Sequence, residues 1–286
     1  MLSNKVNEIM SREMLTADVS TTIFAVMELM VAKNVGRTVI TENQTHIGIF
    51  TEKDVVKRVM DDKFDPKKTG IKEVMTSPIR SVPEDTHIIE ALAKMYRSKS
   101  RHLLVRERKG KIVGMVSMRR ILELAVELGK RLADSQTVGN IISQPPVSID
   151  AAQSIRDAID LMIKKDIGCV AVMSQGQLKG IFTERDVLKR VAVKGLDKQK
   201  TRVEDVMTSN LVTLPDTALV GHVLEEMHKR RFRHMVILGD QGKLVGIVSM
   251  RDVLKYAKAL DVDERVRSTW KEIEEFWESD EHYTPG

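Results

Sequence analysis

The sequence predicts an α+β fold made of four similar β-α-β-β-α units, and three observations lead to this prediction. A glycine-led phrase recurs at a step of 66 residues, beginning at Gly48, Gly114, Gly180 and Gly246. A helical pattern ending in methionine precedes each glycine, and a β-type run, a polar turn and a second β-type run follow that pattern. A fixed period of this kind is the signature of a repeat architecture.

The two helices of each unit follow from apolar spacing. The first helix is predicted from apolar residues at i, i+4 and i+7, a spacing at which methionine is typical of a core. Its members are Ile23, Met27 and Met30; Ile88, Leu92 and Met95; Ile155, Ile159 and Met162; and Val220, Leu224 and Met227. The second helix follows each glycine strand and carries Val55, Val56, Ile121, Leu122, Val187, Leu188, Val253 and Leu254.

The first and third units are more alike than any other two. GIFTEKDVVKRV from Gly48 and GIFTERDVLKRV from Gly180 agree at ten of twelve positions, 132 residues apart, whereas the second and fourth units share VSMR. This pattern predicts a tandem pair duplicated whole, giving two modules, each with a pseudo-twofold axis. A unit of about 60 residues buries only about 60% of its unfolded surface, so we expect the units to pack together.

Composition indicates a globular cytoplasmic protein. The longest unbroken apolar run, residues 167–173, is seven residues, whereas a helix needs roughly 20 to span a bilayer. The N-terminus lacks the features of a secretory signal. Cys169 is the single cysteine, and its apolar neighbours predict a buried core residue rather than a reactive thiol.

The net charge of +5 conceals a charge split. Residues 261–286 hold nine acids and three bases, a net charge of −6, which leaves +11 on the rest. A basic body favours anionic partners, although a well-solvated surface explains the charge equally well. The acidic segment predicts an amphipathic helix, which either docks on the body or binds a partner. Its apolar residues are Val262, Val266, Trp270, Ile273 and Trp277.

Several motifs resemble the cystathionine-β-synthase-type (CBS) domain, whose tandem pairs are called Bateman modules. They are the openings VNEIM at Val6 and VEDVM at Val203, the strand LVTLPDT at Leu211, and glycine-led endings with (S/T)-x-x-D. The resemblance covers about residues 6–260 and implies CBS repeats packed as two tandem-pair modules. The repeats are predicted at residues 6–60, 71–128, 138–193 and 203–260, followed by the acidic helical tail 261–286.

The resemblance also implies an adenine-nucleotide site at the (S/T)-x-x-D motif. The start of a helix suits phosphate, and a carboxylate can accept from two vicinal ribose hydroxyls. A hydroxyl residue from the first strand of the paired repeat commonly completes such a pocket. The alternative is that the same motif only caps a helix, but three intact copies favour a ligand site. The candidate ligand residues are Thr16, Thr51, Asp54, Ser81, Ser148, Thr183, Asp186, Thr213, Ser249 and Asp252.

The second unit departs from this motif because Arg120 stands where the aspartate is expected. Arginine has no acceptor for ribose hydroxyls, so we expect this pocket to lack nucleoside. The γ subunit of AMP-activated protein kinase is similar in having four repeats, one of them with an arginine at this position. The candidate phosphate contacts are Arg37, Arg101, His102, Arg120, Arg233 and His234; alternatively, the Arg-His pairs are ordinary exposed strand residues.

No catalytic apparatus is visible. The sequence has no G-x-S-x-G, P-loop or G-x-G-x-x-G motif and no metal-ligand spacing, so we expect no enzyme activity, catalytic cofactor or metal. It predicts a regulatory sensor for AMP, ADP, ATP or S-adenosylmethionine that controls a protein partner, as a monomeric disc or a homodimer. The alternative is a nucleic-acid-binding regulator using the basic body, although no reading helix or base-stacking aromatics are recognisable. An enzyme related to inosine monophosphate dehydrogenase would need a catalytic barrel of about 250 residues, for which the chain has no room.

Overall fold

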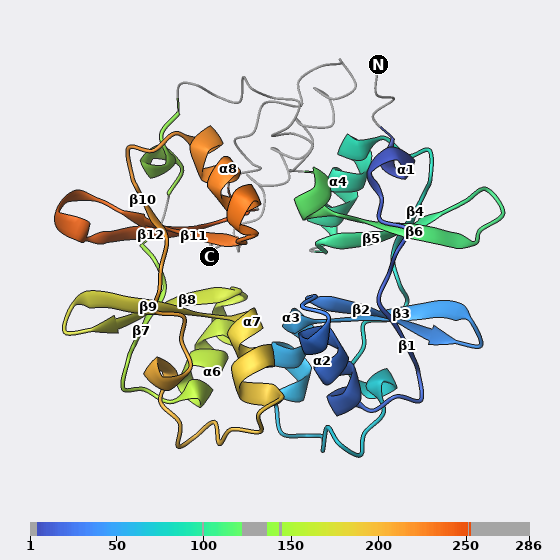
Figure 1. The fold of residues 1–286 in the computed structure, drawn as a ribbon, viewed down its shortest axis with the longest axis horizontal. Helices are drawn as coiled ribbons and strands as arrows, with labels where there is room; N and C mark the ends of the chain where they lie inside the picture. The colour runs from blue at the N-terminus through green and yellow to red at the C-terminus, as the bar shows by residue number, and fades with distance from the viewer. Residues whose placement is uncertain (1–4, 99, 122–135, 143–144, 251, 253–286) are drawn as a thin grey trace. The chain divides into compact units, whose positions relative to one another are not determined.

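The computed structural model describes residues 5–98, 100–121, 136–142, 145–250 and 252, and these residues confirm the predicted α+β fold with four repeats (Figure 1). Each repeat contains a three-stranded sheet whose short first strand runs parallel to the middle strand, while the third runs antiparallel to it. The strands are β1 (Thr16–Asp18), β2 (Arg37–Glu42), β3 (Thr45–Thr51), β4 (Ser81–Pro83), β5 (His102–Arg106), β6 (Ile112–Ser117), β7 (Ser148–Asp150), β8 (Cys169–Ser174), β9 (Gln177–Thr183), β10 (Thr213–Pro215), β11 (His234–Leu238) and β12 (Leu244–Ser249).

One long helix crosses between the first and middle strands of each repeat. The methionine stripe on these helices is core, as predicted, since all twelve stripe residues are buried. Ser154 caps one of them through a reciprocal bond pair with Asp157, and Thr22 caps another. The helices are α2 (Ile23–Ala32), α4 (Ile88–Arg97), α6 (Ile155–Lys165) and α8 (Val220–Arg230).

The second helix begins differently from an ordinary α-helix. In repeats 1 and 3 a single turn, α3 (Glu52–Asp54) or α7 (Glu184–Asp186), runs into a π-helical segment, η1 (Val55–Val59) or η4 (Val187–Ala192). Its predicted apolar residues Val55, Val56, Ile121, Val187 and Leu188 are buried. Leu122, Val253, Leu254 and the predicted tail helix of residues 261–286 lie outside the described residues.

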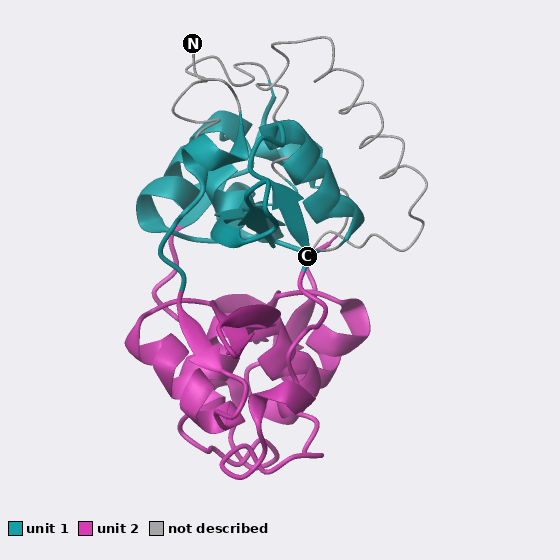
Figure 2. Ribbon diagram, turned by 90° about the vertical axis from the view of Figure 1, so that its right-hand side faces the viewer, with its two compact units in different colours: residues 1–14, 80–144, 213–285 teal, residues 15–79, 145–212, 286 magenta. Residues whose placement is uncertain are grey.

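The chain divides into two compact units, which Figure 2 colours teal and magenta. Unit 1 comprises residues 1–14, 80–144 and 213–285, and so holds the sheets of repeats 2 and 4. Unit 2 comprises residues 15–79, 145–212 and 286, and holds the sheets of repeats 1 and 3. Within unit 2 the two repeats share one hydrophobic core, in which η1 packs against η4, so the expected packing of repeat on repeat is confirmed there. None of the described helices is long and apolar enough to cross a membrane.

The recurring glycines allow another backbone segment to cross the third strand of each sheet. In repeat 3, Ile181 exchanges backbone hydrogen bonds with Thr208, and a Cβ on Gly180 would lie 2.6 Å from the Thr208 carbonyl oxygen. The crossing segment is the opening of repeat 4, which contains the 3₁₀ turn η5 (Val203–Asp205). Gly48, Gly114 and Gly246 face Met75, Met10 and Ile142 in the same way.

Tandem repeats therefore exchange their opening segments. The opening of repeat 1, with α1 (Val6–Ile9), belongs to unit 1, and so does that of repeat 3, with η3 (Val138–Ile141). The opening of repeat 2, with η2 (Ile71–Glu73), belongs to unit 2, as does the opening of repeat 4. A short turn, η6 (Asp240–Gly242), links β11 to β12. The compact units combine parts of different repeats and so do not test where each repeat begins and ends. The predicted repeat bounds therefore stay a prediction.

Candidate functional site

The three predicted (S/T)-x-x-D motifs all form the same structure where the third strand runs into the second helix. In repeat 1, the Thr51 hydroxyl and backbone N–H donate to Asp54 Oδ2 at 2.7 and 2.9 Å, and the Asp54 N–H donates back to Thr51 Oγ1. In repeat 4, the Ser249 hydroxyl and N–H donate to Asp252 Oδ2 at 2.6 and 2.7 Å. Thr183 and Asp186 match them in repeat 3. The capping alternative is thus realised in every copy.

The second carboxylate oxygen has further partners in repeats 1 and 3. Asp54 Oδ1 accepts from the Thr76 hydroxyl at 3.1 Å and lies 3.4 Å from Arg58 Nη1. Burial raises the pKa of the Asp54 carboxyl above its ordinary value, against the hydrogen bonds from Thr51 and the charge of Arg58, which lower it. In repeat 3 the same roles fall to Thr208 and Arg190. Both oxygens are therefore engaged within the chain in these two repeats.

Repeat 4 has a different residue after its aspartate. Four residues beyond Asp252 stands Tyr256, where repeats 1 and 3 have Arg58 and Arg190. Asp252 is 6% exposed and hence as buried as the other two aspartates. The arginine at i+4 that pairs with the outer oxygen in repeats 1 and 3 therefore has no counterpart in the sequence of repeat 4.

Each sheet brings further predicted residues to one face. The residue opening the middle strand lies directly opposite the capping hydroxyl, as Arg37 does to Thr51 and His234 to Ser249. Side chains two residues apart on a strand lie on the same face of the sheet. The residue two positions after the opening residue of the middle strand pairs with the first residue of the first strand, as Val39 pairs with Thr16 and Val236 with Thr213. The hydroxyl residues at those starts are Thr16 and Ser148, which are exposed, and Ser81 and Thr213, which are half-buried.

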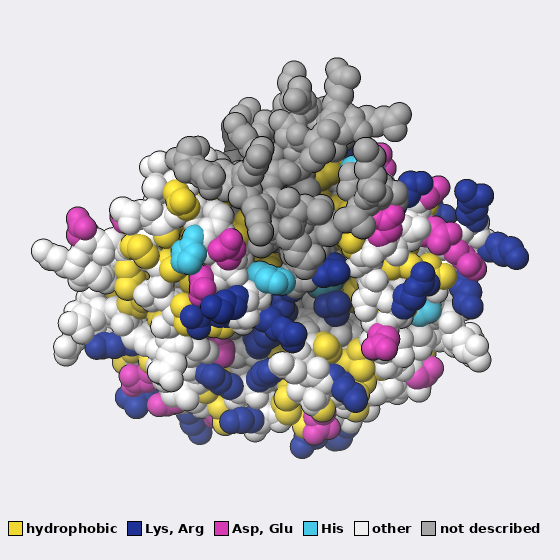
Figure 3. Space-filling model, turned by 45° about the horizontal axis from the view of Figure 1, so that its top comes forward, with side chains coloured by type: hydrophobic (Ala, Val, Ile, Leu, Met, Phe, Trp, Pro, Cys, Tyr) yellow, Lys and Arg dark blue, Asp and Glu magenta, His cyan; other side chains and the backbone are white. Residues whose placement is uncertain are grey.

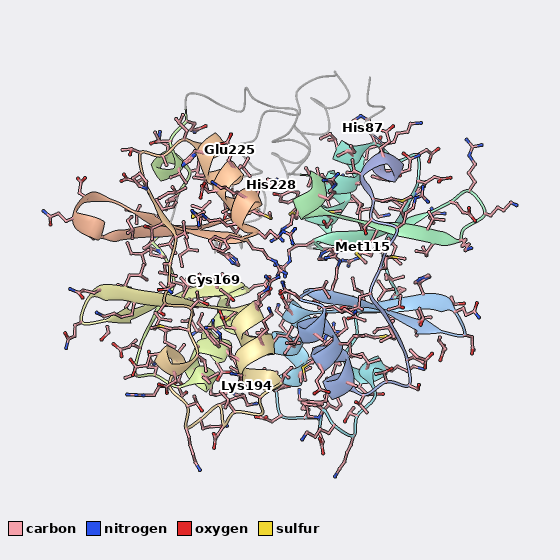
Figure 4. All side chains as sticks on the ribbon, in the orientation of Figure 1. His87, Met115, Cys169, Lys194, Glu225 and His228 are labelled. Carbon is pink, nitrogen blue, oxygen red and sulfur yellow. The ribbon has the colours of Figure 1, made fainter. Side chains whose placement is uncertain are left out.

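In repeat 3 the residue that opens the middle strand, opposite the capping hydroxyl, is not basic. Cys169, labelled on β8 in Figure 4, lies opposite Thr183, where the other repeats place Arg37, His102 and His234. The thiol is 2% exposed, which confirms the predicted buried cysteine. Burial raises the pKa of the Cys169 thiol far above its usual value, and the nearby carboxylates of Asp186 and Glu184 raise it further. This side chain is therefore an uncharged core residue.

Repeat 2 keeps the hydroxyl and loses the acid. The N–H of Arg120 donates to Ser117 Oγ at 3.2 Å, so the helix start is capped by one bond, and the Arg120 side chain is exposed. His102 lies opposite Ser117, and Arg101 accepts a backbone bond from Met118. The junction of repeat 2 thus presents basic side chains without a carboxylate of its own.

Sequence reasoning missed the residues that surround the capped aspartates. Arg58 Nη1 also donates to the carbonyl oxygens of Val74 and Met75, and so ties the second helix to the opening segment that crosses its sheet. Glu52, 1% exposed, accepts from Arg185 Nε at 3.1 Å across the two repeats of unit 2. The sequence did carry a signal for these arginines. The pair Lys57-Arg58 recurs as Lys189-Arg190 in the two long phrases, and charged residues that recur in this way have no role in an apolar core.

Metal ligation has no support in the part of the chain that the structure describes. Among those residues, no group of three or more His, Cys, Asp or Glu side chains could hold a metal ion. The junctions themselves present hydroxyl, carboxylate and basic groups, which form hydrogen bonds and ion pairs.

Comparison with protein families matches the whole repeat region. The model described as "CBS domain" matches residues 6–61, 71–127, 138–193 and 203–259. The Arabidopsis thaliana CBS domain-containing protein CBSCBSPB1 is 28% identical over 284 residues, covering 86% of this chain and 52% of its own length. CBSCBSPB5 of the same plant is 27% identical over 278 residues, covering 82% of this chain and 50% of its own length. The chain spans about half the length of these curated relatives.

A solved structure shares the fold over nearly the whole repeat region. Protein MJ1225 of Methanocaldococcus jannaschii, described as a proposed archaeal homolog of g-AMPK, has a TM-score of 0.75 and 16% identity. The match covers 88% of this chain and 99% of MJ1225. At this identity, the likeness establishes the four-repeat fold.

Proposed function

Because this chain belongs to the CBS domain family, we propose that it is a non-catalytic sensor whose repeats bind an adenosine-type nucleotide and thereby control a protein partner. The ligands considered are AMP, ADP, ATP and S-adenosylmethionine. The observation that carries the proposal is the junction of repeat 4, where one end of the three-stranded sheet presents a capped buried aspartate, two hydroxyl residues and an Arg-His pair. These residues are Thr213, Arg233, His234, Ser249 and Asp252.

The carboxylate would hold the ribose. A carboxylate accepts through two oxygens, and the cap uses Asp252 Oδ2. The diol of a ribose can share that oxygen and use Oδ1, which in repeats 1 and 3 is engaged by a threonine and an arginine. Repeats 1, 3 and 4 are therefore candidate nucleoside sites, and in repeats 1 and 3 the ligand must exchange an internal contact for its own.

Basic side chains beside the junction would hold the phosphate. His234 lies opposite Ser249, at the start of a helix whose N–H groups favour an anion. Arg37 and His102 hold the corresponding position in repeats 1 and 2, whereas repeat 3 has Cys169 there. Repeat 3 is accordingly the weakest phosphate site, and repeat 2, with Arg120, would contact phosphate without holding a ribose.

A thermal-shift panel tests the ligand class. AMP, ADP, ATP, S-adenosylmethionine and GMP would each be added at millimolar concentration to the full chain. A nucleotide present at 100 times its dissociation constant stabilises the protein by about 2.7 kcal/mol. We expect the adenosine compounds to raise the melting temperature and GMP to leave it unchanged; an unchanged melting temperature throughout would refute the proposal.

Asp252→Asn separates the ribose site from the cap. Asparagine keeps the size and one acceptor, so the cost to the helix is about 0.3–1 kcal/mol. We expect calorimetric titration of the variant to lose one nucleotide site while the apo protein melts nearly as before. Asp240→Asn, an exposed loop change in the same repeat, is the matched control and should retain every site. Unaltered stoichiometry and affinity in Asp252→Asn would leave the aspartate as a cap only.

A further inference from the structure

In repeats 1 and 3, the outer oxygen of the capped aspartate is bonded to a threonine of the opening segment that crosses the sheet. The Thr76 hydroxyl donates to Asp54 Oδ1 at 3.1 Å, and the Thr208 hydroxyl donates to Asp186 Oδ1 at the same distance. We call these two bonds the threonine latches. Each latch joins a candidate nucleoside site directly to a crossing segment.

The acceptor sites of the latched aspartates are fully used. A carboxylate offers about four acceptor sites on its two oxygens. Asp54 Oδ2 accepts from the N–H and the hydroxyl of Thr51. Asp54 Oδ1 accepts from Thr76 and lies 3.4 Å from Arg58 Nη1. The repeat 3 counterparts of these residues are Thr183, Asp186, Arg190 and Thr208. A ribose that donates two hydrogen bonds to such an aspartate must therefore displace a donor that is already there.

The latch hydroxyl is the donor that a ribose can replace most easily. The two cap bonds measure 2.7 and 2.9 Å and join residues three apart, whereas the latch bond measures 3.1 Å and joins residues 22 apart. Threonine and ribose both present a secondary alcohol. A ribose hydroxyl can therefore take the place of Thr76 at Asp54 Oδ1 without changing the kind of bond.

Burial makes this exchange dependent on a ligand. Lys and Arg side chains stand beside Asp and Glu on the face shown in Figure 3, and exposed pairs of this kind contribute little to stability. The latched aspartates differ, because the side chains of Asp54 and Asp186 are only 10% and 8% exposed. A buried acceptor that loses a donor is destabilised unless another donor replaces it. We therefore expect the latch to open when a ligand hydroxyl replaces the threonine.

The latched segments lead from one compact unit to the other. Thr76 exchanges backbone hydrogen bonds of 2.8 and 3.0 Å with Ile49 of β3. The chain passes from unit 2 to unit 1 after residue 79, three residues beyond Thr76, and again after residue 212, four residues beyond Thr208. A contact made or lost at the aspartate is thus transmitted to the start of each connection between the units.

Repeat 2 shows that a crossing segment can be held without a latch. Its aspartate is replaced by Arg120, and Ser11, which crosses the sheet of repeat 2, donates its hydroxyl to the Glu13 carbonyl oxygen at 2.8 Å. Ser11 nevertheless exchanges two backbone hydrogen bonds of 2.9 Å with Met115. The backbone bonds alone are enough to hold this crossing, so the latch is an addition found where an aspartate is present.

We propose that Thr76 and Thr208 are internal competitors of the ribose, and that a bound nucleoside opens the latch and loosens the segment leading from unit 2 to unit 1. The ligand part of this proposal rests on the proposed function, whereas the latch itself does not. Because coupling between two binding events is reciprocal, a variant without the latch hydroxyl should bind the nucleoside more tightly. A threonine that contacted the ligand instead would have the opposite effect.

Calorimetric titration with AMP tests the competition. Thr76→Val removes the hydroxyl and keeps the shape of the side chain, and we expect the dissociation constant of one AMP site to fall about fivefold. Thr208→Val repeats the test in the second copy. Ser11→Ala removes the corresponding hydroxyl of repeat 2 and is the matched control, which should bind AMP as the wild type does. Weaker or unchanged AMP binding in both valine variants would overturn the competition.

Hydrogen exchange tests the latch in nucleotide-free protein. The reporter is the amide of Ile49, which donates to the Thr76 carbonyl oxygen, and the reference is the amide of Met115, which donates to Ser11 in repeat 2. We expect Thr76→Val to speed exchange at Ile49 about fivefold and to leave Met115 unchanged. Unchanged exchange at Ile49 would show that the hydroxyl does not hold the segment, and would overturn the latch.

The same exchange measurement with AMP separates this proposal from the proposed function. We expect AMP to speed exchange at the Ile49 amide in the wild type, and to have no such effect in Thr76→Val, where the latch is already absent. Slower or unchanged exchange at Ile49 while calorimetry shows AMP bound would overturn the opening of the latch. Failure of AMP to bind any variant would refute the proposed function and the competition with it, whereas the latch would still be decided in nucleotide-free protein.

Discussion

Unit 2 joins its two repeats through charged and amide side chains, whereas unit 1 uses a different contact at the corresponding place. In unit 2, Lys57 and Lys53 bind Asp166, the C-terminal cap of α6, and Lys189 binds Asn34, which follows Lys33, the C-terminal cap of α2. In unit 1, the cap of α8 is Arg231, and Arg119 bonds to its backbone carbonyl rather than to its side chain. The residue that caps this helix is therefore a hydrogen-bond acceptor, Asp166, in unit 2 and a cation, Arg231, in unit 1.

The difference explains why the first and third repeats share a longer phrase than the second and fourth. Repeats 1 and 3 face each other with η1 against η4, so each must supply similar contacts to the other. Glu52 and Glu184 occur in both copies of that phrase, and Met118 and Met250 replace them in unit 1. Part of the repeated phrase thus serves the pairing of repeats, beyond any role in binding a ligand.

The largest expected effect concerns the glycine crossing. A Cβ at Gly180 would lie 2.6 Å from the Thr208 carbonyl oxygen, and backbone cannot easily yield, so Gly180→Ala should destabilise unit 2 by about 3 kcal/mol. In unit 1, the nearest atoms to a Cβ at Gly246, among the described residues, belong to the Ile142 side chain, at 2.9 Å, and a side chain can move, so Gly246→Ala should cost about 1 kcal/mol. Urea unfolding of both variants measures the difference. Equal costs would show that the crossings in the two units are equally tight.

The buried ion pair of unit 2 gives the next effect. Arg185→Met removes the guanidinium from Glu52, whose carboxylate is 1% exposed, and should cost about 2 kcal/mol. Glu52→Met, which installs the residue found at Met118 in unit 1, leaves only a partly exposed arginine and should cost less than about 1 kcal/mol. Thermal unfolding compares the stability of the two variants. A larger loss of stability in Glu52→Met than in Arg185→Met would contradict the prediction that the unpaired buried carboxylate is the costlier change.

Thr38 offers a gain in stability. Its hydroxyl is fully buried in the core of unit 2 without a hydrogen-bond partner, at a strand position that is apolar in the other repeats, namely Leu103, Val170 and Met235. Thr38→Val removes the unsatisfied hydroxyl and should stabilise the protein by about 1 kcal/mol. A lower melting temperature in this variant would contradict the burial of a lone hydroxyl.

The smallest effect is a pH dependence that Asp166 contributes to unit 2. Partial burial opposes ionisation of Asp166, but hydrogen bonds from Lys57 and Lys53 lower the pKa of its carboxyl to about 2. This pKa lies below the unfolded value of about 3.9, so the stability is present above pH 4 and lost as the pH falls toward 2. Because Asp166 is 44% exposed, solvent limits the contribution to less than about 1 kcal/mol.

Asp166→Asn tests that contribution, since it installs the amide that Asn34 supplies at the corresponding position of repeat 1. The variant should lose part of the acid dependence of stability between pH 4 and pH 2, and the difference from the wild type should shrink in high salt. Unfolding curves at pH 5, 3.5 and 2.5 provide the measurement. An identical pH dependence in both proteins would exclude Asp166 as its source.

Local patterns in the sequence were enough to predict the repeat and its core. The methionine stripe, the strand pairs and buried Cys169 follow from periods of 3.6 and 2 residues, which depend on neighbours along the chain. The caps at Thr51, Thr183 and Ser249 also lay within reach, because each joins residues three apart. What the periodicity missed locally was the π-helical turn after each cap in repeats 1 and 3.

Only the tertiary structure decided which repeats share a core and what surrounds each aspartate. The bond from Thr76 to Asp54 joins residues 22 apart, and that from Arg185 to Glu52 joins residues 133 apart. The exchange of opening segments likewise depends on which sheet each opening meets after folding. Such contacts arise from the packing of whole elements, and a local pattern is compatible with several packings, so the sequence alone could not choose between them.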